Sequence, residues 1–164
     1  MTVVGVTGHS DLTGRSIDLV RHDIVDQLRP HAADLVGMTC LARGADQAFA
    51  DAVLELGGAL KVVAPASDYF TRISDPDSRK RCEGYLRAAV STVTMPYDTS
   101  GPAAYLCASK YLVNRCDVLL AVWDGSPATG NGGTADAVDY ARECERSIVV
   151  VWPHGAQRRS RRPR

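Results

Sequence analysis

The sequence has no hydrophobic run long enough for a membrane-spanning helix. Its longest apolar stretch, 59–66, is interrupted by Lys61, whereas a helix that crosses a bilayer needs about 20 apolar residues. The chain enters a strand-like run directly at Thr2, without the basic region and apolar core of a signal peptide. We therefore expect a cytoplasmic protein that has no membrane as a partner.

The cysteines lack the spacing of a metal site or a redox motif. There is no Cys-x-x-Cys, and no cysteine stands at metal-ligand spacing from a histidine. An odd, scattered set inside apolar segments is typical of small buried side chains in a reducing compartment. We expect no structural disulfide, no metal ion and no cofactor. The five cysteines are Cys40, Cys82, Cys107, Cys116 and Cys144.

The chain has no net charge, yet the two signs are unevenly distributed. Five of the 19 basic residues are arginines in the last eight positions, which contain no acid, so 14 bases (19 minus 5) face 19 acids in the rest. An acidic body argues against nucleic acid as a partner. We interpret 154–164 as a basic, flexible tail, with contact to nucleic acid or a membrane surface as the alternative.

Extended and helical patterns alternate along residues 1–153, which we interpret as one domain. Single helices between strands predict an α/β, Rossmann-like, doubly wound and mainly parallel sheet of about six strands with helices on both faces. The ligand site of such a sheet lies beyond the carboxyl ends of its strands. The predicted strands are 2–7, 35–40, 60–64, 91–95, 118–123 and 147–152, and the predicted helices are 13–28, 45–56, 77–89, 103–114 and 134–144.

A glycine-rich loop follows the predicted strand 118–123 and ends where a helix begins. Glycines let a backbone approach an anion closely, and the first N–H groups of the helix point at it. We therefore predict a phosphate-binding loop, although such a loop also serves as a plain connection. The predicted ligand residues of this loop are Gly130, Asn131, Gly132, Gly133 and Thr134.

Two further loops follow strands at the same predicted edge. Gly8, His9 and Ser10 come after the first strand, and Arg43, Gly44 and Asp46 come after the second. His9, Arg43 and Arg15 are candidate cations for a phosphate, or else surface bases. Asp46 is a candidate partner for a ribose or base, or else a cap of its own loop.

Aromatic side chains and one more carboxylate lie near this edge. Tyr69, Phe70 and Trp123 are candidates for stacking on a base, with core packing as the alternative. Asp124 is a candidate for holding a ribose hydroxyl or assisting hydrolysis, with a turn-forming role as the alternative. A homo-oligomer is expected because two helices have more apolar surface than one sheet face needs, at Tyr85, Leu86, Tyr105, Leu106, Tyr111 and Leu112.

The three loops, in this order and spacing, resemble the SLOG superfamily, which includes DprA and the LOG-type cytokinin-activating proteins. The strand 118–123 and its loop also look like those of nucleoside 2-deoxyribosyltransferases. In LOG-type enzymes a Pro-Gly-Gly-x-Gly-Thr-x-x-Glu motif holds a nucleotide phosphate and supplies a carboxylate for cleaving the N-glycosidic bond. Gly133 and Thr134 match its Gly-Thr, but Ala137 falls where the Glu belongs.

The resemblance implies a nucleotide-related function, of which two forms remain open. The first is a sensor or carrier that binds a phosphorylated nucleotide or nucleotide-derived ligand without assured catalysis. The alternative is a nucleotide N-glycosidase or phosphoribohydrolase that uses Asp136 or Asp124 in place of the missing Glu. A DNA-handling role in the manner of DprA is the third and weakest reading, because the body is acidic.

Overall fold

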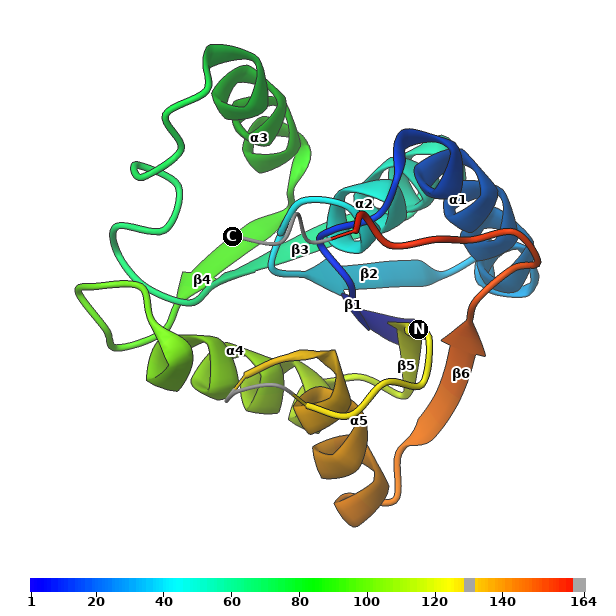
Figure 1. Cartoon of the computed structure of the whole chain (residues 1–164). Helices are drawn as coiled ribbons and strands as arrows, with labels where there is room; N and C mark the ends of the chain where they lie inside the picture. The colour runs from blue at the N-terminus through cyan, green and yellow to red at the C-terminus, as the bar shows by residue number, and fades with distance from the viewer. Residues whose placement is uncertain (129–131, 161–164) are drawn as a thin grey trace.

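The sheet of this protein is built from six strands that all run in parallel. The computed structural model describes residues 1–128 and 132–160. The strands lie in the order β4-β3-β2-β1-β5-β6 (Figure 1). Their bounds are β1 Thr2–Gly8, β2 Leu35–Thr39, β3 Ala59–Ala64, β4 Ser91–Thr94, β5 Val118–Val122 and β6 Ser147–Val151. The predicted α/β fold is confirmed.

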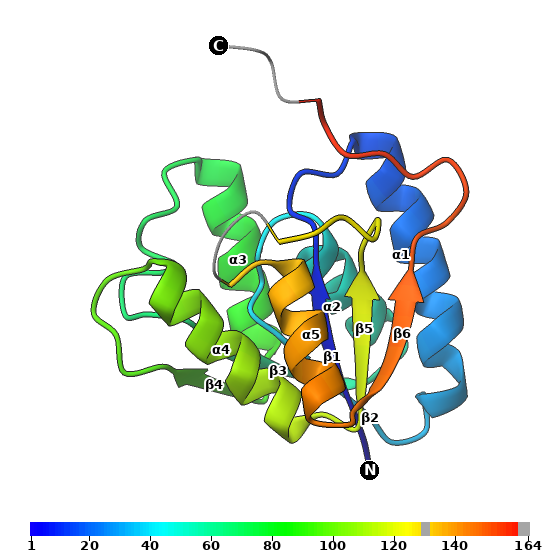
Figure 2. The same cartoon turned by 60° about the horizontal axis from the view of Figure 1, so that its bottom comes forward.

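Helices cover both faces of the sheet and form a separate hydrophobic core on each face. Helices α1, α2 and α3 lie on one face, and α4 and α5 lie on the other (Figures 1 and 2). Because side chains alternate along a strand, Val4 and Val6 of β1 enter the first core and Val3 enters the second. The bounds are α1 Gly14–Leu28, a 3-10 turn Arg29–His31, α2 Ala45–Glu55, α3 Pro76–Ala88, α4 Pro102–Arg115 and α5 Thr134–Glu143.

The strand order reverses between β1 and β5. From β1 the chain moves outward through β2 and β3 to β4, then returns to pair β5 with the other side of β1. The loops after β1, β2 and β5 therefore lie at one edge of the sheet, as the sequence predicts. In doubly wound sheets, ligands bind at this edge next to the reversal point.

The helices bear on two further expectations, the absence of a membrane span and the apolar surface for an oligomer. In the described part of the chain, none of them is long and apolar enough to cross a membrane. Of the side chains on which the expected oligomer rests, Tyr85 and Leu112 are buried inside this chain, whereas Tyr105 is exposed. The homo-oligomer stays a prediction.

Gly8 stands at a tight junction of three elements. A Cβ atom placed on Gly8 would lie 2.5 Å from the Cβ of Ala45, the first residue of α2, and 2.7 Å from the Cβ of Val122 in β5. Real Cβ atoms do not approach other atoms this closely. The missing side chain thus lets α2 and β5 meet at the end of β1, which sets the start of the next loop.

The Gly8→Ala variant is expected to lose about 1–3 kcal/mol of stability, because the added methyl group overpacks this junction. The control is Gly14→Ala at the start of α1, where an added Cβ meets no atom of the described part of the chain within 4 Å. Urea unfolding of both variants measures the difference. Equal midpoints for Gly8→Ala and Gly14→Ala would contradict the tight packing.

Candidate functional site

A cavity of about 640 Å³ opens at the carboxyl edge of the sheet. It is lined by the loops after β1, β2 and β5, by the first turn of α5, and by the C-terminal segment that follows β6. This volume lies within the range of ordinary small-molecule sites. The predicted ligand residues that line it are Gly8, His9, Ser10, Asp46, Gly132, Gly133 and Thr134.

Other predicted ligand residues do not line the cavity. Arg43 and Arg15 are exposed and lie outside the lining. Gly44 joins two loops instead: the N–H of Ala45 after it donates to the carbonyl oxygen of His9 at 3.2 Å. At its φ of +78°, a side chain would strain the backbone and meet that oxygen at 2.8 Å. Gly130 and Asn131 lie outside the described residues.

His9 is held at the floor of the cavity by Asp124. Its backbone N–H donates to the carbonyl of Val122, which extends the β1–β5 pairing by one residue. The side chain is buried, its Nε2 lies 2.9 Å from Oδ1 of Asp124, and its ring meets Trp152 edge-on. Asp124 itself lies outside the lining. Its role in this arrangement is to orient His9.

Asp124 is also bound by the turn that follows it. The amide and the hydroxyl of Ser126 donate to Oδ1 of Asp124 at 2.9 and 2.6 Å. Burial by itself raises the pKa of Asp124, but the hydrogen bonds from Ser126 and His9 outweigh it and hold that pKa well below its usual range. Asp124 is therefore ionised at neutral pH and is not a proton donor.

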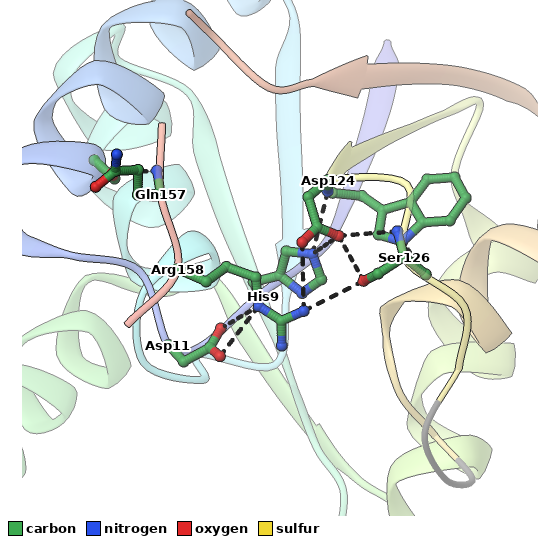
Figure 3. A network of polar contacts seen from close by, with 8 residues as sticks. His9, Asp11, Asp124, Ser126, Gln157 and Arg158 are labelled. Atoms are coloured by element: carbon green, nitrogen blue, oxygen red, sulfur yellow. Dashed lines mark hydrogen bonds and ion pairs between the residues drawn. The ribbon is translucent and has the colours of Figure 1, made fainter. Parts of the chain in front are cut away.

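Arg158 reaches the cavity from the C-terminal segment, and sequence reasoning missed it. Its Nε donates to both carboxylate oxygens of Asp11, at 2.9 and 3.1 Å, while Nη1 lies 3.3 Å from Oγ of Ser126 and 3.5 Å from Oδ2 of Asp124. The guanidinium thus lies between two carboxylates that follow different strands (Figure 3). Asp11, Ser126 and Arg158 all line the cavity.

Asp46 stabilises the loop between β2 and α2. Its Oδ2 accepts hydrogen bonds from the Thr39 hydroxyl and from the N–H groups of Cys40 and Ala42, at 3.2, 3.2 and 3.4 Å. Burial raises the pKa of Asp46 to about 7, although these donors oppose the shift. The cap that the sequence left as an alternative is therefore formed, while the side chain still lines the cavity.

The first turn of α5 faces the cavity, but its residues have different environments. Gly132 has a φ of +83°, and its Cβ would lie 2.9 Å from the Cβ of Tyr105. A Cβ on Gly133 would meet no atom of residues 1–128 or 132–160 within 4 Å. Asp136 accepts the N–H of Gly133 at 3.3 Å and lies outside the lining, whereas Ala137 lines the cavity. Gly132 thus fits against α4, and Gly133 borders open space.

Aromatic side chains form part of the wall. Tyr69 and Tyr105 line the cavity with their ring centroids 6.3 Å apart, and Trp123 also lines it. Phe70 packs edge-on against Tyr69 and lies outside the lining. Tyr105, on α4, was not among the predicted stacking residues, because its place at the cavity depends on the packing of α4 beside Gly132.

Metal ligands do not gather anywhere in residues 1–128 and 132–160: no group of three or more His, Cys, Asp or Glu side chains there is placed to hold an ion. All five cysteines are free thiols. The polar part of the cavity instead combines one histidine, carboxylates, an arginine pair and helix N–H groups. Such a lining is suited to a polar organic ligand that has an anionic group.

Comparison with known proteins shows the fold. No protein-family model and no curated protein sequence matches this chain. Its structure is similar to that of DNA processing protein A (DprA) from Streptococcus pneumoniae, with a TM-score of 0.68 and 17% identity over 92% of this chain and 50% of the other. DprA from Helicobacter pylori, described in a single-stranded DNA binding mode, has a TM-score of 0.66 and 14% identity over 91% of this chain and 64% of the other.

A molybdenum cofactor binding protein from the phototrophic bacterium Rippkaea orientalis also shares the fold. Its TM-score is 0.59, with 14% identity over 91% of this chain and 75% of the other. The chain spans half of the length of the pneumococcal DprA and about two thirds of the Helicobacter protein. These likenesses show that the chain has the same fold as these proteins, whereas membership of the SLOG superfamily stays a prediction. The local similarity to deoxyribosyltransferases stays a prediction.

Proposed function

We propose that this protein binds a phosphorylated nucleotide or a nucleotide-derived ligand in the cavity at the carboxyl edge of its sheet, as a sensor or carrier. The main support is the position of the cavity: it lies beside the strand reversal between β1 and β5 and includes the first turn of α5. The unpaired N–H groups of a first helical turn attract a phosphate. The tyrosines of the wall offer stacking surfaces for a base.

Binding without catalysis is favoured over N-glycosidic cleavage because none of the three candidate catalytic positions offers a free carboxylate to the cavity. Ala137 lines the cavity where LOG-type enzymes have a catalytic Glu. Asp136 binds the N–H of Gly133, and Asp124 binds His9 and Ser126. Cleavage needs a carboxylate beside the developing positive charge of the sugar, so the enzyme remains the second candidate.

The ligands named for two proteins of the same fold widen the set of ligands to be tested. The fold is shared by a molybdenum cofactor binding protein and by DprA in a single-stranded DNA binding mode. Mass spectrometry of small molecules released from the purified, denatured protein identifies what the cavity holds. Calorimetry with AMP, ADP-ribose and a single-stranded oligonucleotide then compares the three ligand classes. Tighter binding of the oligonucleotide than of either nucleotide would contradict the proposal.

The Gly133→Val variant is expected to bind AMP at least about tenfold more weakly. Its side chain enters the open space before α5 and separates a phosphate from the helix N–H groups, and hydrogen bonds to a charged group contribute about 1.5–3 kcal/mol each. Since no atom of the described residues lies within 4 Å of the added Cβ, the variant is expected to keep its fold. Isothermal titration calorimetry measures the affinity, and thermal unfolding verifies the fold.

The matched control for this variant is Gly101→Val. Gly101 precedes the first residue of α4 as Gly133 precedes that of α5. Its Cβ also meets no described atom within 4 Å, and it lies outside the cavity. Both substitutions replace a glycine at the N-cap of a helix, so each carries a capping cost. Equal AMP affinity in both variants would remove the start of α5 from the site.

A further inference from the structure

The C-terminal segment forms a wall of the cavity. Residues 154–160 follow β6 and return across the carboxyl edge to the loop between β1 and α1 (Figures 1 and 2). The N–H of Thr13 donates to the carbonyl of Gln157 at 3.1 Å, and the N–H of Arg159 donates to that of Asp11 at 2.6 Å. The N–H of Gln157 reaches Oγ of Ser16 at 2.7 Å. Backbone hydrogen bonds therefore hold this segment in place.

The guanidinium of Arg158 is held from two sides. Nε and Nη1 are bound to Asp11, Asp124 and Ser126 (Figure 3). Nη2 makes no hydrogen bond to any residue within 1–128 or 132–160. A guanidinium has five N–H donors in a planar fork, which suits the oxygens of a phosphate. Arg158 thus keeps two donors for a ligand while its orientation is set by the protein.

Positive charge in the lining of the cavity comes from Arg158 and its neighbour. Arg158 and Arg159 are the only Lys or Arg side chains among the described residues that line the cavity, and both belong to the C-terminal segment. Asp11 and Asp124 flank this arginine and would repel a bare anion. An anionic ligand at this edge therefore requires the cation that these carboxylates hold.

We propose that Arg158 binds the phosphate of the ligand, and that Asp11 and Asp124 position it for this role. The inference rests on the proposed function and assigns the residue that recognises the anionic group of the ligand. Because the side chain is already ordered in the free protein, binding costs little further rotamer entropy. The site therefore distinguishes a nucleotide from its nucleoside, which has no group for Arg158 to bind.

The test compares AMP with adenosine by isothermal titration calorimetry. Arg158→Gln is expected to weaken AMP binding about 10- to 100-fold, as the loss of charge-assisted hydrogen bonds implies, and to change adenosine binding less than about twofold. Arg158→Lys keeps the charge without the planar fork of donors, and its affinity for AMP is expected to lie between those of the wild-type protein and Arg158→Gln. Arg21→Gln is the control, because Arg21 forms a comparable pair with Glu55 at 2.6 Å outside the cavity.

Asp11→Asn separates positioning from simple charge repulsion. Removing a negative charge from the cavity would by Coulomb's law strengthen AMP binding. If Asp11 positions Arg158, its replacement weakens AMP binding instead and leaves adenosine binding unchanged. Tighter AMP binding by this variant would refute the positioning role.

The outcomes distinguish this inference from the function on which it rests. If the wild-type protein binds AMP and Arg158→Gln binds it equally well or more tightly, the C-terminal segment only covers the cavity and the inference is wrong while the proposed function stands. If the wild-type protein binds none of AMP, ADP-ribose and adenosine, both fail. Thermal unfolding of each variant verifies that the comparison is between folded proteins.

Discussion

Between about pH 4 and pH 8, the Asp46→Asn variant is expected to gain about 4 kcal/mol in free energy of unfolding relative to the wild-type protein. Burial raises the pKa of Asp46 from 3.8 to about 7 in the folded state. The unfolded chain thus releases this proton near pH 4, whereas the folded chain keeps it until about pH 7. The stability that the protonated group contributes is full below the lower pKa and is lost as the pH rises through the higher one. Asparagine cannot ionise and escapes this loss.

Urea unfolding at about pH 4, 6 and 8 measures the free energy of unfolding of both proteins, and the expected effect is a change with pH in the difference between these two values. The control is Asp75→Asn. Asp75 is an exposed cap of α3 that accepts the N–H of Ser78 at 2.8 Å, and the Ser78 hydrogen bonds lower its pKa. Its stabilising contribution is therefore lost only below the measured range. A difference between wild type and Asp46→Asn that stays constant with pH would show that Asp46 is ionised throughout.

The fold could be predicted from the sequence because its signals are local and repeated. Apolar runs such as Val118–Val122 belong to strands buried on both faces, and each is followed by a segment of helical periodicity. A single helix between strands permits only a parallel crossover of one hand. Every bound of the predicted strands and helices lies within one residue of the structure.

The roles of individual loop residues could not be predicted, because they depend on neighbours from other elements. Gly132 and Gly133 are equivalent in sequence, yet only Gly132 lies against Tyr105 of α4. The sequence is compatible with Asp46 as a ligand partner and with Asp46 as a loop cap, and in the structure three donors bind its carboxylate as a cap. Loop composition indicates the edge of the sheet at which a site lies, but tertiary packing assigns the residues.

The place of the C-terminal segment could not be predicted from the sequence. Its arginines show no periodicity, so we interpreted 154–164 as a flexible tail, whereas residues 154–160 bind to the loop after β1. One available signal was the presence of two carboxylates, Asp11 and Asp124, just after neighbouring strands of an acidic body. Such a pair favours a neighbouring cation, and the end of the chain holds five arginines. The structure joins Asp11 to Arg158, which is 147 residues away.

The Ala137→Glu variant is expected to cleave the N-glycosidic bond of AMP about 10²- to 10⁴-fold faster than the wild-type protein, which is expected to cleave it far more slowly than LOG-type enzymes. Ala137 lines the cavity one turn into α5, where the sequence resemblance predicts the catalytic Glu of these enzymes. Cleavage builds positive charge on the sugar, which a carboxylate stabilises and alanine does not. The cavity of about 640 Å³ leaves room for the longer side chain.

The control for this variant is Ala137→Gln, which adds the same volume without the charge. Chromatographic measurement of free adenine separates the three proteins, and only Ala137→Glu is expected to release it above background. Equal rates for the Glu and Gln variants would show that a phosphate at the start of α5 does not place the sugar beside residue 137. Rapid release by the wild-type protein that persists in Asp136→Asn and Asp124→Asn would place the active site elsewhere, because neither carboxylate nor Ala137 could then account for the chemistry.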